Sequence, residues 1–349
     1  MQQIISKAAI LRQINKPLEI SNVLVPKKLF KGQILVKMMY SGICGSQLGE
    51  IQGVKGKDKY LPHLLGHEGI AKVIKKNSYV KKVKEGDIVL LHWMPSNGIN
   101  SKNPIYIDKK NRKINAGFVT TFNEYAVVSE NRLTKINKKK KNYLDYLLLG
   151  CTSSTAIGSV NKNLPIKKKS FIIVSGCGAI GLYIIKYLKF LGIKNIIGID
   201  VHYKKIKFAK KLGCVKVFNS KEKDFIKKLN NSLSNGADYV FECSGNSNQI
   251  SNMFKVLNSK GSLNLIGVPN HGSKSGFNTL DINLGKKIIG NKGGDFYAKK
   301  HISQYKKIIF SKHCNHRNFI TEIIKLNSLN DYFRKMAQGK ILGKGIIRF

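Results

Sequence analysis

A glycine-rich turn between an apolar run and a helical pattern constrains this chain more than any other feature. Gly176, Gly178 and Gly181 in VSGCGAIG match the spacing G-x-G-x-x-G, directly after FIIV and directly before AIGLYIIKYLKFLG. The first glycine permits a tight turn, the second lets the backbone approach a pyrophosphate, and the third lets the helix pack closely on the strand. The helix would begin with free N–H groups, which bind phosphate. The motif therefore predicts a dinucleotide site, in which Ala179 and Ile180 supply the backbone between the last two glycines.

An acidic residue stands where such a site needs one. Asp200 ends the run KNIIGID, about 20 residues beyond the last glycine, and an acid at that distance binds ribose hydroxyls. Its charge would repel a 2′-phosphate, so we expect NAD rather than NADP. Lys204 and Lys205 weaken this preference because a cation there can receive a phosphate, and Lys205 is included among the expected cofactor contacts. The alternative is a glycine-rich turn that binds nothing, and the complete order of strand, turn, helix and acid argues against it.

The rest of the sequence is organised around this motif. From about residue 150, short apolar runs alternate with helical patterns, as in KNIIGID followed by KKIKFAKKLG, and ADYVFECSG followed by a helix expected to end near Lys260. Such alternation predicts an α/β fold with a doubly wound parallel sheet. Before residue 150, β-branched runs separated by glycine, Asn and Asp indicate a β-rich domain. A chain of 349 residues exceeds what one core usually organises. We therefore expect a β-rich domain over 1–152, to which 293–349 return, and a nucleotide-binding domain over 153–292.

The composition is strongly basic, with 62 Lys and Arg against 19 Asp and Glu and a formal net charge of +43. The lysines are spread over the whole length and accompany abundant Asn and Ile, all encoded by AT-rich codons, so coding bias is a sufficient cause. No helix-turn-helix, zinc finger or base-stacking motif accompanies the charge, and we do not expect specific nucleic-acid binding. No apolar run is long enough for a membrane span and the N-terminus lacks a secretory pattern, which predicts a cytoplasmic protein without membrane partners.

Cys44 raises a separate question, because a lone cysteine in a turn such as SGICGSQLGE is usually a small buried hydrophobe. The six cysteines are irregularly spaced, which suits reduced thiols or metal ligation better than disulfides. Candidate partners are His67 and Glu68 in LLGHEGI, and Cys151 in LLLGCTSSTAIGSV at the expected domain junction. Together with EGDIV, the nucleotide motif and GADYVFECSG, this set closely resembles the zinc-dependent alcohol dehydrogenase family of medium-chain dehydrogenases/reductases.

The resemblance covers nearly the whole chain and implies a GroES-like catalytic domain joined to a Rossmann domain. It implies that Cys44, His67 and Cys151 hold a catalytic Zn²⁺, with the fourth position taken by water, substrate or, intermittently, Glu68. Two thiolates would leave the ion a moderate Lewis acid during hydride transfer with the nicotinamide. Further roles are implied for Ser46, which touches the reacting oxygen and passes its proton, for Trp93 in the substrate pocket, and for Lys344 at the pyrophosphate. Ser46 could instead bond its local backbone, and Trp93 could equally be a core residue.

Three departures from the family pattern matter. Gln47 and Gly49 stand where relatives often carry a carboxylate and a relay histidine, so the proton exit differs. Residues 94–122 contain none of the four cysteines that bind a structural zinc in many relatives, which predicts one zinc per chain. The C-terminal basic residue at the pyrophosphate is not uniquely placed, and Lys344 is preferred to Arg348.

We therefore expect an oxidoreductase that transfers a hydride between NAD and a primary or secondary alcohol, first a polyol, a sugar or a sugar-linked alcohol. The segment INAGFVTTFNEYAVVSENRLT, which resembles a bacterial subgroup tied to surface-polysaccharide building blocks, favours that substrate class. A simple-alcohol or threonine-type dehydrogenase is the next alternative. A non-catalytic NAD-binding protein that binds RNA or another polyanion, and a zinc-free quinone or enoyl reductase, are disfavoured by the complete ligand set. We expect a homodimer or homotetramer.

Overall fold

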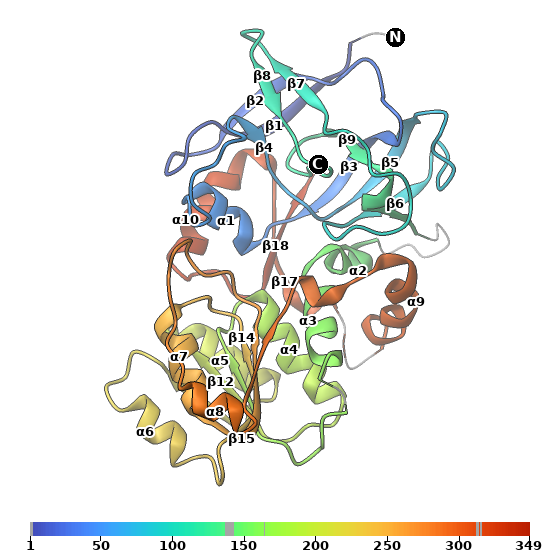
Figure 1. The fold of residues 1–349 in the computed structure, drawn as a ribbon. Helices are drawn as coiled ribbons and strands as arrows, with labels where there is room; N and C mark the ends of the chain where they lie inside the picture. The colour runs from blue at the N-terminus through green and yellow to red at the C-terminus, as the bar shows by residue number, and fades with distance from the viewer. Residues whose placement is uncertain (1–2, 137–142, 164, 312–313, 315) are drawn as a thin grey trace. The chain divides into compact units, whose positions relative to one another are not determined.

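The computed structural model describes residues 3–136, 143–163, 165–311, 314 and 316–349, and the chain divides into two compact units. Unit 1 consists of Met1–Cys151, Tyr297–Ser311 and Asn315–Phe349, and unit 2 consists of Thr152–Phe296 and Lys312–Cys314. Figure 1 shows the elements of both units along the chain. The main chain therefore changes unit after Cys151 and after Phe296, where the sequence predicted boundaries after 152 and after 292.

Unit 1 contains a closed barrel and a seven-stranded sheet. The barrel strands follow in the order β1 (Ile5–Leu11), β2 (Glu19–Leu24), β7 (Ile105–Asp108), β8 (Lys113–Asn115) and β4 (His63–Leu64). The other sheet has the order β10 (Leu133–Lys135), β6 (Ile88–Leu91), β5 (Gly69–Lys76), β3 (Gln33–Gly42), β18 (Lys344–Arg348) and β17 (Ile320–Ile324), and β9 (Tyr125–Ser129) also pairs with β3. The hairpin of β7 and β8 lies in the segment that lacks the four cysteines.

Strand β3 is the central support of unit 1 and leads directly into the candidate metal site. Alternate side chains of a strand face opposite sides. Ile34 and Val36 accordingly pack into one core with residues of β5, β6 and β9, whereas Leu35 packs into another with residues of β1. The strand is buried on both sides for this reason, and it ends at Gly42, two residues before Cys44.

Unit 1 also contains several helices. They are α1 (Gly45–Ile51), α2 (Leu144–Leu147), α9 (Ala298–Ile309) and α10 (Leu329–Ala337), with short 3₁₀ turns at Glu130–Arg132, Leu148–Gly150, His316–Phe319 and Leu326–Ser328. Apolar side chains of α10, among them Leu329 and Phe333, pack with Ile43 and Ile347 into a third core. That core lies beneath the turn that carries Cys44, so α10 and β18 support the site from the C-terminal part of the chain.

Unit 2 is a six-stranded parallel sheet of α/β type, as the sequence predicts. Its strand order is β13 (Lys216–Asn219), β12 (Ile196–Asp200), β11 (Ile172–Ser175), β14 (Ala237–Glu242), β15 (Leu257–Leu265) and β16 (Lys287–Gly290). The helices are α3 (Thr152–Asn161), α4 (Ala179–Phe190), α5 (Tyr203–Leu212), α6 (Phe225–Asn230), α7 (Ser247–Lys255) and α8 (Thr279–Asn283), with a 3₁₀ turn at Gly293–Asp295.

One predicted element boundary is wrong. The helix after β14 was expected to end near Lys260, but α7 ends at Lys255 and β15 begins at Leu257. Leu257 already pairs with Ala237 of β14, across an irregularity in the register. The polar residues after it therefore belong to the strand, because pairing with a distant segment outweighs their local preference. Among the described residues, no helix combines the length and the apolar character needed to cross a bilayer.

Candidate metal centre and nucleotide site

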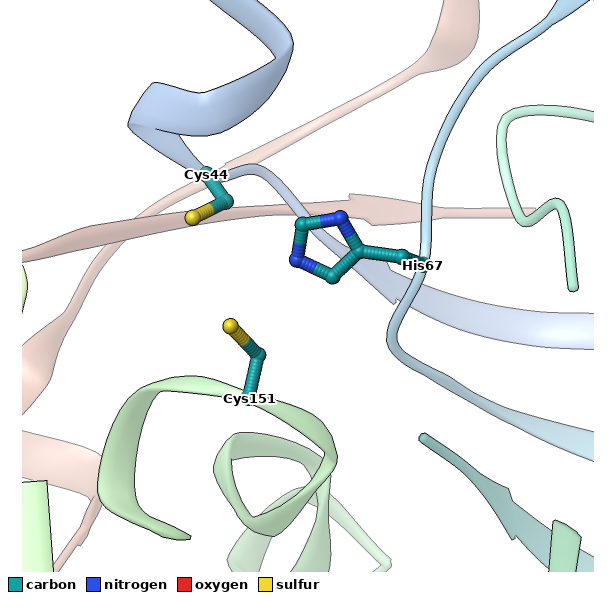
Figure 2. Close-up of side chains that lie close together, drawn as sticks. All are labelled: Cys44, His67 and Cys151. Atoms are coloured by element: carbon teal, nitrogen blue, oxygen red, sulfur yellow. The ribbon is translucent and has the colours of Figure 1, made fainter. Parts of the chain in front are cut away.

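Three side chains of unit 1 converge on one point. Cys44 lies at the start of α1, His67 lies between β4 and β5, and Cys151 follows the 3₁₀ turn Leu148–Gly150; Figure 2 shows their side chains facing a common space. One ligand atom from each, two sulfurs and an imidazole nitrogen, lies within 4.8 Å of the others. The Nε2 atom of His67 is buried and has no hydrogen-bond partner. An orphaned nitrogen beside two thiols is the chemistry of a metal site rather than of an apolar core.

Glycines make room for the acid next to His67. A Cβ atom built on Gly42 would lie 2.6 Å from Glu68 Cδ, and one built on Gly150 would lie 2.6 Å from Glu68 Cβ. Both distances are far below van der Waals contact. Gly42, two residues before Cys44, and Gly150, directly before Cys151, therefore allow Glu68 to lie beside the site.

Glu68 forms a buried ion pair with Lys344. The two side chains are 0% and 1% exposed, and Lys344 Nζ donates to Glu68 Oε1. Burial raises the pKa of Glu68, and the charge of Lys344 opposes that rise. Glu68 lies outside the cluster of three ligand atoms, and its Oε2 has no hydrogen-bond partner. The structure thus directs the Lys344 ammonium at Glu68, and the contact of Lys344 with a pyrophosphate stays a prediction.

The two cysteines differ in acidity. A hydrogen bond from the Cys151 thiol lowers the pKa of Cys44 well below its ordinary value, and the charge of Lys344 lowers it further. The same hydrogen bond, together with burial, raises the pKa of Cys151. Cys44 is therefore the more acidic thiol of the two.

The glycine-rich turn of unit 2 has the predicted strand, turn and helix arrangement. Gly176 follows β11 with φ +92°, and a Cβ atom there would lie 2.7 Å from Ser244 N. Gly181 lies in α4, where a Cβ atom would lie 2.1 Å from Gly176 O, whereas Gly178 has no atom within 4 Å of its Cβ position. Helix α4 begins at Ala179, followed by Ile180, and no side chain caps it. The open position of Gly178 and the uncapped helix start are the features that a phosphate needs.

Asp200 lies at the end of β12 beside this turn. Its Oδ2 accepts from Cys177 N at 2.8 Å and its Oδ1 accepts from His202 N at 3.0 Å. A cavity of about 390 Å³ opens next to it, and Gly176, Asp200, Phe225 and several amide side chains line the cavity. Lys205 lies in the first turn of α5 and is not among the lining residues. Hydrogen bonds from two backbone N–H groups therefore hold the Asp200 carboxylate at the edge of the cavity, which is large enough for part of a nucleotide.

Two family models match the chain: the alcohol dehydrogenase GroES-like domain over residues 31–138, and the zinc-binding dehydrogenase over residues 179–308. This chain belongs to the zinc-dependent alcohol dehydrogenase family. The resemblance inferred from the sequence, the GroES-like domain and the Rossmann domain are therefore confirmed. The matched ranges cover both the metal-ligand candidates Cys44 and His67 and the helix that follows the glycine turn.

Relatives of this dehydrogenase match it along almost its whole length. Alcohol dehydrogenase-like 7 of Arabidopsis thaliana is 27% identical, over 96% of this chain and 93% of the relative. The S-(hydroxymethyl)glutathione dehydrogenase of Escherichia coli is 26% identical, over 99% and 100%. A crystal structure of an alcohol dehydrogenase zinc-binding domain protein from Burkholderia ambifaria superposes with a TM-score of 0.87 at 23% identity, covering 100% of both chains. At this level of identity, the similarity to the Burkholderia ambifaria structure shows a shared fold.

Zinc fits the residues that this dehydrogenase presents. Two cysteines and one histidine with an open fourth position form a catalytic zinc site, and this ligand set is the one already established for alcohol dehydrogenases. The unpartnered His67 Nε2 and the grouping of the three ligand atoms within 4.8 Å are the observations that satisfy this requirement.

The two predicted catalytic side chains near the ligands carry polar atoms without partners. Ser46 lies in the first turn of α1, and its Oγ is buried with no hydrogen bond, so the alternative local backbone bond is absent. Trp93 is half-buried beyond the end of β6, and its ring centroid lies 6.5 Å from that of His67. Its Nε1 also lacks a partner, and Trp93 is not part of the apolar cores described above. The ring of Trp93 thus lies near His67 and Ser46 follows Cys44 by two residues, and the catalytic roles of both stay predictions.

Gln47 is the residue whose contacts the sequence did not predict. It is 1% exposed, its Oε1 accepts from Cys44 N at 2.7 Å, and its Nε2 lies 2.5 Å from His67 Nδ1. The sequence indicated only that a carboxylate was missing. A signal was nevertheless present, because a Gln three positions after the N-cap residue of a helix, here Cys44, commonly bonds back to the N–H of that residue.

Proposed function

We propose that this protein transfers a hydride between an alcohol and NAD at a zinc site held by Cys44, His67 and Cys151. The observation that carries the proposal is the convergence of the three ligand atoms within 4.8 Å, with a buried, unpartnered His67 Nε2 among them. When bound there, zinc would polarise the substrate oxygen and favour removal of the hydroxyl proton.

The chain's own residues supply the proton path and the charge balance. Ser46 Oγ, which has no partner within the protein, would accept the hydroxyl proton of the substrate and pass it to the cofactor ribose or to water. The substrate carbon would give its hydride to the nicotinamide, so that an alcohol and NAD⁺ become a carbonyl compound, NADH and a proton. Lys344 compensates the charge of Glu68 and thereby limits the negative charge near the reacting groups.

The preference for NAD is part of the proposal. Asp200 is held by two backbone N–H groups at the edge of the cavity in unit 2, where it would accept from both ribose hydroxyls. A 2′-phosphate would meet a fixed negative charge at this place. Comparison of kcat/KM for NAD and NADP tests this, and a preference for NADP would mean that Lys204 and Lys205 dominate over the carboxylate.

For the substrate we propose a polyol, a sugar or a sugar-linked alcohol. The unpartnered Oγ of Ser46 and Nε1 of Trp93 support a substrate with more than one polar group, because each needs a hydrogen-bond partner. A simple alcohol or a threonine-type amino alcohol is the second candidate. The named substrate of the Escherichia coli relative shows that the family accepts other alcohols.

The decisive experiment combines metal analysis with an NAD-coupled screen of polyols, sugar alcohols, simple alcohols and threonine. Zinc-dependent NADH formation with any of these supports the proposed activity, and the best kcat/KM identifies the class. RNA retention that weakens with salt, without dehydrogenase activity, would instead support the non-catalytic alternative.

A further inference from the structure

The amide of Gln47 has only one possible orientation. A backbone N–H is always a donor, so the Gln47 atom that lies 2.7 Å from Cys44 N must be the oxygen. The amide nitrogen then faces His67 Nδ1 at 2.5 Å. Gln47 is 1% exposed, so water cannot easily replace either partner.

This orientation decides which imidazole nitrogen carries the proton. An amide NH₂ group donates and cannot accept, so His67 Nδ1 must present its lone pair to it. A neutral imidazole then carries its proton on Nε2. Nε2 is the buried atom of the ligand cluster, and a nitrogen that binds a metal must present a lone pair.

Metal binding therefore places two donors against a single oxygen. With a metal on Nε2, Nδ1 carries the proton and needs an acceptor, while Cys44 N–H still needs the acceptor that it has now. A carboxylate could accept from both at once through its two oxygens. The Gln47 amide has only one such oxygen, which now lies at Cys44 N, while its NH₂ group lies at His67 Nδ1. The amide must therefore turn before its oxygen can accept from a proton on Nδ1.

We propose that Gln47 is a positioning residue that opposes metal binding: it holds His67 with its proton on Nε2, and metal binding requires the amide to turn its oxygen toward Nδ1 and away from its present position at Cys44 N. The proton that leaves Nε2 is replaced by one on Nδ1, exchanged through water, so the imidazole stays neutral. The inference rests on the metal site of the proposed function but not on the substrate or the reaction.

The first test uses wild-type protein freed of metal. ¹⁵N NMR of the histidine rings distinguishes a proton on Nδ1 from one on Nε2, and a His67→Gln variant assigns the signal. We expect Nε2–H in the wild-type protein and Nδ1–H in Gln47→Glu. A signal for Nδ1–H in the metal-free wild-type protein would overturn the proposal without any need for a variant of Gln47 to fold.

The second test measures zinc affinity by competition with a chromophoric chelator. Gln47→Glu should bind zinc about 10- to 100-fold more tightly than wild type, the usual size of such an outer-shell effect. Gln33→Glu is the matched control, because Gln33 is equally buried but satisfies both ends of its amide, accepting from Phe30 N and donating to Lys102 O, each at 2.9 Å.

The outcomes separate the possible causes. Unchanged zinc affinity in Gln47→Glu contradicts the proposal, and an equal gain in Gln33→Glu would assign the effect to added charge alone. Failure of the wild-type protein to bind zinc at all would contradict the proposed function. The NMR result on the metal-free imidazole would still stand in that case, so the two proposals can fail separately.

Discussion

At the scale of single residues, Gly42 supports the site by having no side chain. A Cβ atom there would lie 2.6 Å from Glu68 Cδ, so Gly42→Ala must displace the carboxylate that Lys344 neutralises. We expect Gly42→Ala to lower the free energy of unfolding by about 1–3 kcal/mol, as for other overpacked core positions. Gly45→Ala is the matched control, since nothing lies within 4 Å of its Cβ position. Chemical denaturation measures the free energy of unfolding of both variants. Equal values would show that Glu68 can move without destabilising the folded protein.

Ser46 offers the clearest test of the proton path. Neither Gln47 nor Gly49 has a titrating side chain, so the proposed path begins at Ser46 Oγ. Ser46→Ala should lower kcat/KM by about 100- to 10,000-fold, the range for a positioned proton-transfer group. Zinc content should not change, and Ser46→Thr should keep much of the activity because it keeps the hydroxyl. Near-normal activity of Ser46→Ala with full zinc occupancy would make Ser46 a turn residue only.

At the scale of elements, His92 joins the ends of β6 and β10. The side chain is fully buried, Nδ1 donates to Met94 O at 2.7 Å, and Nε2 lies 3.1 Å from Thr134 Oγ1, which can donate to it. A neutral imidazole satisfies both contacts. Burial disfavours the charged imidazolium and lowers the pKa of His92 to about 4.

This shift predicts a loss of stability in acid. An unfolded histidine has a pKa of about 6.5, so between pH ~6.5 and ~4 the unfolded chain binds a proton that the folded chain does not. The free energy of unfolding should fall by up to about 3 kcal/mol as the pH drops through this window. Denaturation monitored by Trp93, the only tryptophan, should show a shallower pH dependence in His92→Asn, whereas variation of the exposed His271 should leave it unchanged. Identical pH dependence in wild type and His92→Asn would contradict the assignment.

The elements also show what a sequence can predict. The glycine turn and the strands around it follow from local periodicity and from residues that permit tight turns, and both were predicted. The start of β15 was not, because it depends on pairing between Leu257 and Ala237 rather than on local preference. The same reason applies in the site, where Gln47 meets His67 20 residues away and Lys344 meets Glu68 276 residues away. The resemblance to a family identified Cys44, His67 and Cys151, but it could not supply contacts that are particular to this chain.

At the scale of the whole molecule, the candidate metal ligands and the candidate nucleotide-binding residues belong to different units. Cys44, His67 and Cys151 lie in unit 1, and the glycine turn and Asp200 lie in unit 2. The segment 94–122 holds no cysteine and contains the β7–β8 hairpin. Elemental analysis should therefore find about one zinc per chain, and a ratio near two would refute this interpretation of the segment.

Cys151→Ala tests the independence of the two sites. The substitution removes one of the three ligand atoms, so bound zinc should fall below the level detected by elemental analysis. The turn at Gly176 and the two bonds that hold Asp200 involve only residues of unit 2, so NAD affinity measured by calorimetry should stay within about a factor of three of wild type, a change of ~0.7 kcal/mol. Cys214→Ala is the matched control, because that cysteine is also buried but lies in unit 2, and it should keep its zinc. Loss of NAD binding together with zinc in Cys151→Ala, with the circular dichroism of the folded protein preserved, would mean that the metal site stabilises the nucleotide site.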